Sequence, residues 1–140
     1  KMNTHFVERF NVQQSLADAQ AITSTLQPGE SLVYFPEGTF TRAPGLRAFK
    51  MGAFTTAVQA KLSILPVAMR GTRSILRGSE WRVRRGAINL VFGPLISCPE
   101  ELRGELGEEL VGDHWTRALY LRNKSREFIL PHCGEPDLES

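Results

Sequence analysis

The sequence predicts an α/β fold in which a partial mixed sheet is flanked by helices. Three short apolar runs of strand type alternate with segments whose apolar residues recur at helical spacing. The resulting order of helix, strand, helix, strand, strand and helix is typical of a sheet with helices packed on its faces. The 140 residues suit one domain, and 41% hydrophobic residues argue against a disordered chain. We expect the sheet to be incomplete at its N-terminal side.

The first half of the chain is expected to hold one strand between two helices. Residues 11–26 carry apolar side chains at helical spacing, and Gln-Pro-Gly at 27–29 stops this helix. Residues 31–35 are an apolar run that we predict to be a buried strand, ended by Pro36. A second amphipathic helix is expected over residues 47–61.

The second half is expected to hold two more strands and a long helix. Residues 63–69 are predicted to be a buried strand, and Pro66 favours an edge or a bulge there. Residues 87–92 are predicted to be the third strand, because a Gly-Pro pair follows and ends them. Residues 101–130 are expected to be mostly helical, and residues 131–140 are expected to be a tail.

Charge is distributed unevenly although the formal net charge is only +2. Residues 70–85 contain six arginines and one acid, whereas residues 99–113 contain six acids and one arginine. The molecule is therefore expected to be polarised, with one basic patch. Two cysteines are too few for a disulfide framework, so we expect reduced thiols. The sequence has no apolar run long enough to span a membrane and no visible signal peptide.

The segment after the first strand, YFPEGTFTRAPGLRAFKMGAF at 34–54, has the composition of an anion-binding loop. Gly38 lets the backbone approach a ligand closely, and Arg42, Arg47 and Lys50 add positive charge. A helix that starts near Arg47 would also point its free N–H groups toward the same place. These features predict a phosphate pocket. The alternative from the residues alone is a polar loop with solvated charges.

Four stretches resemble the signature blocks of the glycerolipid acyltransferases, the family of the 1-acylglycerol-3-phosphate acyltransferases. FPEGT at 35–39, followed by FKMGA at 49–53, resembles the third block of that family. HFVERF at 5–10 is similar to the second block, and ILPVAMRGT at 64–72 is similar to the fourth. INLVFGPLI at 88–96 resembles the strand and Gly-Pro turn that follow. The ordered set carries the resemblance, and FPEGT is its most specific member.

The resemblance implies a role for the matching residues. Arg9 would bind the phosphate of the acyl acceptor with Glu8 beside it, and the Glu-Gly-Thr turn would shape the acceptor site. Pro66 would end a strand near the entrance for the acyl chain. Together with the basic residues of the loop, the predicted substrate-binding residues are Glu8, Arg9, Glu37, Gly38, Thr39, Arg42, Lys50 and Pro66.

The chain departs from the family pattern in two places. Phe40 and Thr41 follow Glu-Gly-Thr where the family most often has Arg and Ser, so the arginine is displaced to position 42. The family's first block, a catalytic His followed after four residues by an Asp, is absent ahead of the second block. His132 and Asp137 have that spacing but follow the other blocks, so we interpret them as a coincidence. No catalytic residue and no metal site is therefore assigned in this chain.

The arginine-rich segment at 70–85 allows three interpretations. It would touch anionic lipid head groups with Trp81 at the interface, bind nucleic acid, or form a solvated hairpin between two strands. Base stacking needs more than one interleaved aromatic residue, so nucleic-acid binding is the least favoured interpretation and no such partner is expected.

The resemblance implies that the parent protein transfers a fatty acyl group from acyl-CoA or acyl-carrier protein to a lysophospholipid, most simply 1-acylglycerol-3-phosphate. Residues 1–130 would be the C-terminal portion of the acyltransferase domain, without activity of its own. No metal or organic cofactor is expected, and the protein would work at an anionic membrane surface on its cytoplasmic face. The rival hypothesis is a non-catalytic module that binds anionic lipid head groups.

Overall fold

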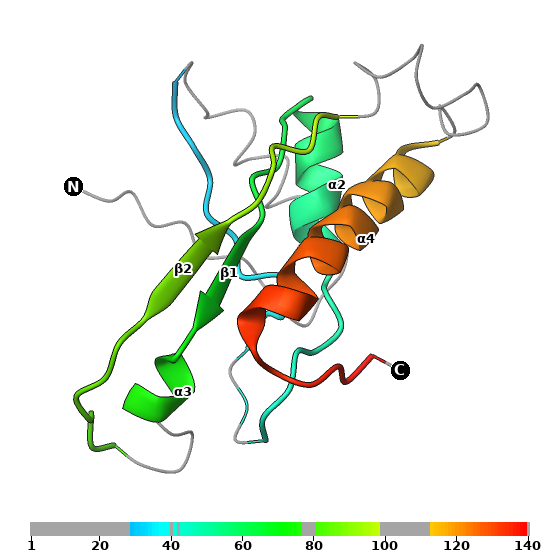
Figure 1. Cartoon of the computed structure of the whole chain (residues 1–140). Helices are drawn as coiled ribbons and strands as arrows, with labels where there is room; N and C mark the ends of the chain where they lie inside the picture. Colours follow the sequence, from blue (N-terminus) through cyan, green and yellow to red (C-terminus); the bar gives the residue numbers. More distant parts are fainter. Residues whose placement is uncertain (1–28, 40, 42, 77–80, 99–112, 140) are drawn as a thin grey trace.

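The computed structural model describes residues 29–39, 41, 43–76, 81–98 and 113–139. In this part of the chain the order of elements is helix α2 (Gly52–Gln59), strand β1 (Val67–Arg70), short helix α3 (Thr72–Ile75), strand β2 (Asn89–Phe92) and helix α4 (His114–Cys133). Helix α4 packs against both α2 and β1 (Figure 1). Helices and sheet are both present, as the sequence predicted for an α/β protein.

The two strands pair antiparallel over their whole length, which differs from the mixed sheet that was expected. Beyond the strands, Ile64 and Ile96 exchange two backbone hydrogen bonds of 2.9 and 2.8 Å, and these extend the antiparallel pairing to the residues before β1. The structure thus confirms strands at both predicted segments, as β1 at Val67–Arg70 and β2 at Asn89–Phe92. The first is not the buried strand that was expected, because Met69 and Arg70 are exposed. The register pairs are Val67–Phe92, Ala68–Val91, Met69–Leu90 and Arg70–Asn89.

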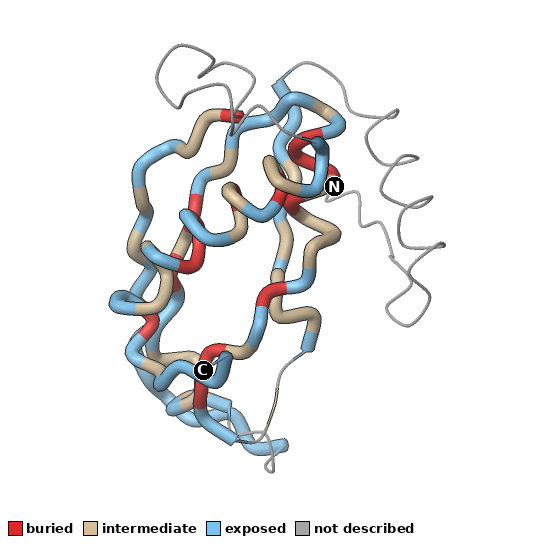
Figure 2. The backbone as a smooth tube through the Cα atoms, turned by 90° about the vertical axis from the view of Figure 1, so that its right-hand side faces the viewer, coloured by how far each residue is buried: buried red, intermediate tan, exposed pale blue. Residues whose placement is uncertain are grey.

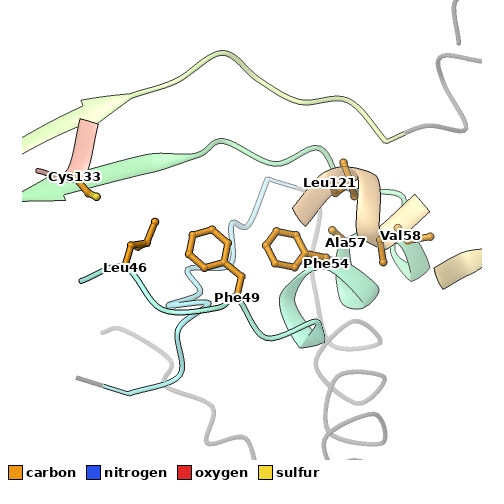
Figure 3. Packing of buried hydrophobic residues seen from close by; sticks show 8 residues of the cluster. Leu46, Phe49, Phe54, Ala57, Val58, Leu121 and Cys133 are labelled. Atoms are coloured by element: carbon orange, nitrogen blue, oxygen red, sulfur yellow. The ribbon is translucent and has the colours of Figure 1, made fainter. Parts of the chain in front are cut away.

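The hydrophobic core lies where α2 meets α4 and the loop that precedes α2. Figure 3 shows Phe49 from this loop beside Phe54 of α2, and their rings stack with centroids 6.3 Å apart. Leu121 of α4 lies against α2 from the other side and is fully buried. The buried members of this cluster are Leu46, Phe49, Phe54, Ala57, Val58, Ala118, Leu121 and Cys133.

Helix α4 has clear signals at both of its ends. The Asp113 carboxylate caps its first turn by accepting hydrogen bonds from the backbone N–H and the hydroxyl of Thr116, both at 2.9 Å. Gly134 ends the helix in the left-handed region, with φ +71°. Pro131 lies within the last turn, so the helix runs through the point where the sequence predicted a tail to begin. The predicted helical start at residues 101–112 lies outside the described residues.

Two predictions for the first half were wrong. Residues 31–35 do not form a strand, and Val33 and Phe35 are 82% and 75% exposed. A strand requires a hydrogen-bonded neighbour, and no strand in the described part of the chain pairs with this run. The helix predicted over 47–61 is present as α2, but it begins at Gly52, because the N–H groups of Arg47 and Lys50 bond to Glu37 and Pro36. The helix predicted over 11–26 lies outside the described residues.

Buried stretches are short and are separated by long exposed ones (Figure 2). All residues from 81 to 90 are exposed, although β2 begins within this segment. The outward face of the strand pair carries exposed Met69, Leu90 and Phe92. Among the helices that the structure describes, none combines the length and the apolarity needed to cross a membrane.

Candidate functional site

The candidate site is built on residues 36–50, called loop 36–50 below. Its two ends meet, because the backbone N–H of Lys50 donates to the carbonyl of Pro36 at 2.7 Å. A tight turn opens the loop, with the N–H of Gly38 donating to the carbonyl of Phe35 at 3.0 Å. The loop therefore closes on itself immediately before helix α2, which fixes the Glu-Gly-Thr turn beside the residues that lead into the helix.

Glu37 holds this closure with its side chain. The half-buried carboxylate accepts a hydrogen bond from the backbone N–H of Arg47 at 2.9 Å. A bond to an ionised acceptor is stronger than a neutral one, so Glu37 ties the turn to the far arm of the loop. Arg47 thus enters the site through its backbone and not through a helix N-terminus, because α2 begins only at Gly52.

Gly38 and Lys50 lie together at the opening of the loop. Gly38 has φ +73°, which an L side chain rarely adopts. A Cβ atom built there would lie 3.6 Å from Cγ of Lys50, so the stem of the exposed lysine passes close to the glycine. Thr39 follows the turn and is exposed. The structure therefore brings together Glu37, Gly38, Thr39 and Lys50 from the predicted site.

The remaining predicted site residues are not part of this cluster. Glu8, Arg9 and Arg42 lie outside the described residues. Pro66 is buried at the start of β1, where its ring and the ring of Phe128 both lie against Gly93. Its carbonyl accepts a hydrogen bond from the N–H of Gly93 at 2.9 Å. Pro66 therefore has a packing position in this structure, and its place near an acyl chain stays a prediction.

The sequence did not indicate the three residues that bond to the backbone of loop 36–50 from α3, from α4 and from the segment after α4. Arg73 of α3, Arg126 of α4 and Glu135 beyond α4 all bond to the backbone of this loop. One signal could have found Arg126. It lies three and four residues before Ile129 and Leu130, which pack against the core, and a charge on such a face needs a partner inside the protein.

The basic segment is far more open. Residues 81–85, called the arginine ribbon below, are all exposed, and Trp81 is 92% exposed. The N–H of Arg84 donates to the carbonyl of Ile75 at 2.8 Å, which attaches the ribbon to α3. Apolar and cationic side chains thus lie next to one another on a surface that water reaches.

The His-x4-Asp pair near the C-terminus has separate partners. His132 is exposed and stacks on Phe128 with ring centroids 4.5 Å apart, and its Nδ1 lies 2.7 Å from the Phe128 carbonyl. Asp137 pairs with Arg126 and accepts the N–H of Glu139. Within the described residues no group of three or more His, Cys, Asp and Glu side chains could hold a metal ion. Cys98 and Cys133 are buried free thiols, as expected for reduced cysteines.

Comparison with known proteins gives one family match. A sequence model described as "Acyltransferase" matches residues 1–70, which include loop 36–50 and β1. The match ends before Arg73, so Arg73, Arg126 and Glu135 lie beyond it. No solved structure matches this chain significantly.

Relatives with curated names agree with this match. The chain is 36% identical over 68 residues to the chloroplastic 1-acyl-sn-glycerol-3-phosphate acyltransferase LPAT1 of Arabidopsis thaliana, covering 48% of this chain and 19% of that protein. It is 30% identical over 95 residues to the 1-acyl-sn-glycerol-3-phosphate acyltransferase of Cocos nucifera, covering 66% of this chain and 31% of the relative. The corresponding protein of Borreliella burgdorferi is 33% identical over 73 residues, covering 52% and 29%. The chain therefore spans less than a third of the length of these relatives.

Proposed function

The chain belongs to the acyltransferase family, and from this premise we propose that it carries the acceptor-binding part of an enzyme that esterifies 1-acylglycerol-3-phosphate. One observation supports this most. The matched segment contains both predicted acceptor blocks, and the relatives that align with it are named 1-acyl-sn-glycerol-3-phosphate acyltransferases. The chain thus takes part in phospholipid biosynthesis.

Loop 36–50 would receive the phosphate of the acceptor. Lys50 places its cationic side chain beside the Gly38 turn, where no Cβ atom blocks an approaching ligand. Glu37 serves as a brace in this proposal, because its carboxylate bonds to the N–H of Arg47. Arg9 and Arg42 would add charge to the same anion, and Arg9 would be the main phosphate ligand.

The reaction would be direct transfer without a metal or an organic cofactor. The acceptor hydroxyl attacks the carbonyl carbon of an acyl thioester, a C–O ester bond forms, and the C–S bond breaks. The thiol of CoA or acyl-carrier protein leaves and takes up the proton that the hydroxyl loses. A His-x4-Asp pair would supply the base and its orienting carboxylate. The residues ahead of Arg9 do not contain this pair, so we propose that this chain alone binds the acceptor without transferring the acyl group.

We further propose that the arginine ribbon contacts an anionic membrane on the cytoplasmic face. Its exposed Trp81 has the amphipathic character of interfacial residues. Each arginine near such a surface contributes about 1 kcal/mol of attraction. The acceptor and the acyl donor would meet the site at this membrane.

A second candidate is a head-group-binding module without catalysis. It is favoured by one observation, namely that Lys50 lies beside the Gly38 turn, because binding an anionic head group there needs no catalytic base. Binding of nucleic acid through residues 70–85 is less favoured, because Trp81 is the single aromatic residue in that segment.

The test measures binding and turnover on the same protein. Calorimetric titration with a short-chain, soluble 1-acylglycerol-3-phosphate should give binding that lysophosphatidylcholine does not give. Arg9→Ala should abolish this binding, whereas Lys124→Ala, an exposed charge on α4, should leave it intact. Thiol release from acyl-CoA should stay at background. Failure to prefer the phosphate monoester would contradict the proposal, and acceptor-dependent thiol release would contradict the claim that the chain alone is inactive.

A further inference from the structure

The segment after α4 runs beside loop 36–50 and bonds to its backbone. The N–H of Leu46 donates to the carbonyl of Pro136 at 2.8 Å, and the N–H of Leu138 donates to the carbonyl of Leu46 at 3.0 Å. This pattern is a parallel bridge between Leu46 and Asp137. In Figure 1 the red C-terminal end turns back from α4 to lie beside the loop. The expected tail is therefore attached to the candidate site.

Charged side chains strengthen this attachment at the first arm of the loop. The carboxylate of Glu135 accepts the N–H of Gly45 at 2.6 Å and pairs with Nε of Arg73 at 2.9 Å. Arg73 in turn donates from Nη1 to the carbonyl of Thr41 at 2.7 Å. Glu135 and Arg73 thus join the C-terminal segment, α3 and the loop in one chain of hydrogen bonds.

Arg126 holds the second arm and is the most buried charge of the arrangement, with 9% exposure. Its Nη1 donates to the carbonyl of Arg47 at 2.8 Å, and its Nη2 lies 3.4 Å from the carbonyl of Leu46. It also pairs with Asp137, and its Nε lies 2.9 Å from a carboxylate oxygen of Glu139. A buried charge is costly unless its partners are in place, and here two carboxylates and two carbonyls supply them.

Arg47 connects this arrangement to the candidate site. Its N–H is held by Glu37 at 2.9 Å, and its carbonyl is held by Arg126 at 2.8 Å. One residue is therefore fixed from the site on one side and from α4 on the other. If Arg126 were lost, the carbonyl of Arg47 would lose this partner, and the residue that donates to Glu37 would be held from one side only.

We propose that Arg126 and residues 135–139, together called the C-terminal clasp, are positioning residues that fix the shape of loop 36–50 for acceptor binding. The inference deepens the proposed function and rests on it. The clasp touches the backbone of the loop from the side of α4, so it acts through Arg47 and Leu46 and not by contact with the lipid. It lies entirely beyond the part of the chain that matches the family model.

The experiment compares two clasp variants with a matched control. Arg126→Lys keeps the charge but replaces a planar fork with a single ammonium group, which cannot reach both carbonyls and both carboxylates. Glu135→Gln weakens only the link to Gly45 and Arg73. Lys124→Met removes a cation from the exposed side of the same helix, where it pairs with Glu127. Backbone amide exchange and affinity for short-chain 1-acylglycerol-3-phosphate are measured on the full chain.

In Arg126→Lys the amides of Leu46 and Arg47 should exchange about tenfold faster, and lipid affinity should fall about tenfold. The amide of Ala60, at the end of α2, should exchange at the wild-type rate. Glu135→Gln should accelerate exchange mainly at the amide of Gly45, and it should lower the lipid affinity less than Arg126→Lys does. Lys124→Met should change neither the exchange nor the affinity.

Two outcomes would overturn the inference. If exchange of the loop amides becomes faster only together with exchange of the Ala60 amide, then Arg126 contributes to global stability and not to the loop in particular. Faster loop exchange with unchanged lipid affinity would show that the clasp does not position the site. If the wild-type chain does not bind the lipid, the proposed function fails. The clasp is then judged by amide exchange alone, and unchanged loop exchange in Arg126→Lys overturns it.

Discussion

Arg126 and the arginine ribbon place the same type of side chain in opposite surroundings. Arg126 is enclosed on α4 and bonds to the loop backbone and to Asp137 and Glu139. The ribbon arginines Arg82, Arg84 and Arg85 lie on a fully exposed segment next to Trp81. Clustering in the sequence points to the ribbon, whereas the loop contacts of Arg126 depend on residues about 80 positions away in the sequence.

The largest effect should come from removing the buried cation. Arg126→Met removes the cation that bonds to the carbonyl of Arg47 and to the carboxylate of Asp137. Because Asp137 is partly exposed, the loss should be about 2–3 kcal/mol of unfolding free energy. Urea unfolding followed by circular dichroism measures this cost. The control is Arg85→Met, the same substitution in the ribbon, which should change stability by less than about 0.5 kcal/mol. Equal losses of stability at Arg126 and Arg85 would show that the contacts of Arg126 do not make it more important for folding than a ribbon arginine.

The next effect concerns the exposed side of the comparison. Arg82→Gln combined with Arg85→Gln should leave unfolding unchanged, because both side chains are exposed. The double variant should lose about 2 kcal/mol of affinity for vesicles that contain phosphatidylserine, at about 1 kcal/mol per arginine. Sedimentation with vesicles measures this affinity, and phosphatidylcholine vesicles are the reference. Unchanged affinity for the anionic vesicles would reject the ribbon as the membrane contact.

A smaller effect should follow from crowding the clasp against the loop. Gly45 has φ +138°, and a Cβ atom there would lie 2.3 Å from Cγ of Leu138. Gly45→Ala should cost about 1–2 kcal/mol through backbone strain, with Leu138 displaced toward solvent. Gly29→Ala is the matched control for a positive φ, because nothing lies within 4 Å of its added Cβ. If both variants lose the same stability, the loss reflects φ alone and not the contact with Leu138.

The smallest effect should appear at the start of α4, on the exposed Asp113 cap. Hydrogen bonds from the backbone and side chain of Thr116 lower the pKa of Asp113 from its ordinary value of 3.8. Because the folded-state pKa is the lower one, the contribution of the cap is complete above pH 3.8 and is lost as the pH falls through the lowered pKa. Asp113→Ala should therefore unfold at a lower temperature than the wild type at pH 7. The difference should vanish at low pH, and a difference that persists there would contradict the assignment.

Local patterns predicted the parts of the fold that local interactions determine. The strand at 87–92 was recognised from its apolar run and the Gly-Pro pair behind it, and β2 occupies Asn89–Phe92. The helical spacing of the core residues in α2 was likewise visible in the sequence. The apolar run at 31–35 failed as a strand, because pairing depends on a neighbour that composition does not reveal. Pro131 was read as the end of a helix, yet Gly134 ends it.

The chemistry of the candidate site stays a prediction, whereas the structure shows how its described residues are held. The Pro-Glu-Gly-Thr turn and Lys50 were identified from residue type and resemblance, and the structure places them together. The brace from Glu37 to Arg47 and the contacts of Arg126 were not foreseen. The bonds from Gly45 to Glu135 and from Arg126 to Arg47 join residues 90 and 79 positions apart. No short-range pattern indicates which distant partner a backbone carbonyl will find.

This separation sets an order of events during synthesis. The ribosome completes loop 36–50 long before it adds Arg126 and Glu135, so the loop emerges without the partners that its backbone has in the finished protein. At a translation rate of about 5–20 residues per second, the interval lasts several seconds. A chain that stops before α4 would contain the residues of loop 36–50 but not Arg126 and Glu135, which bond to the backbone of this loop. The loop backbone therefore gains these partners only after α4 and residues 135–139 have been synthesised.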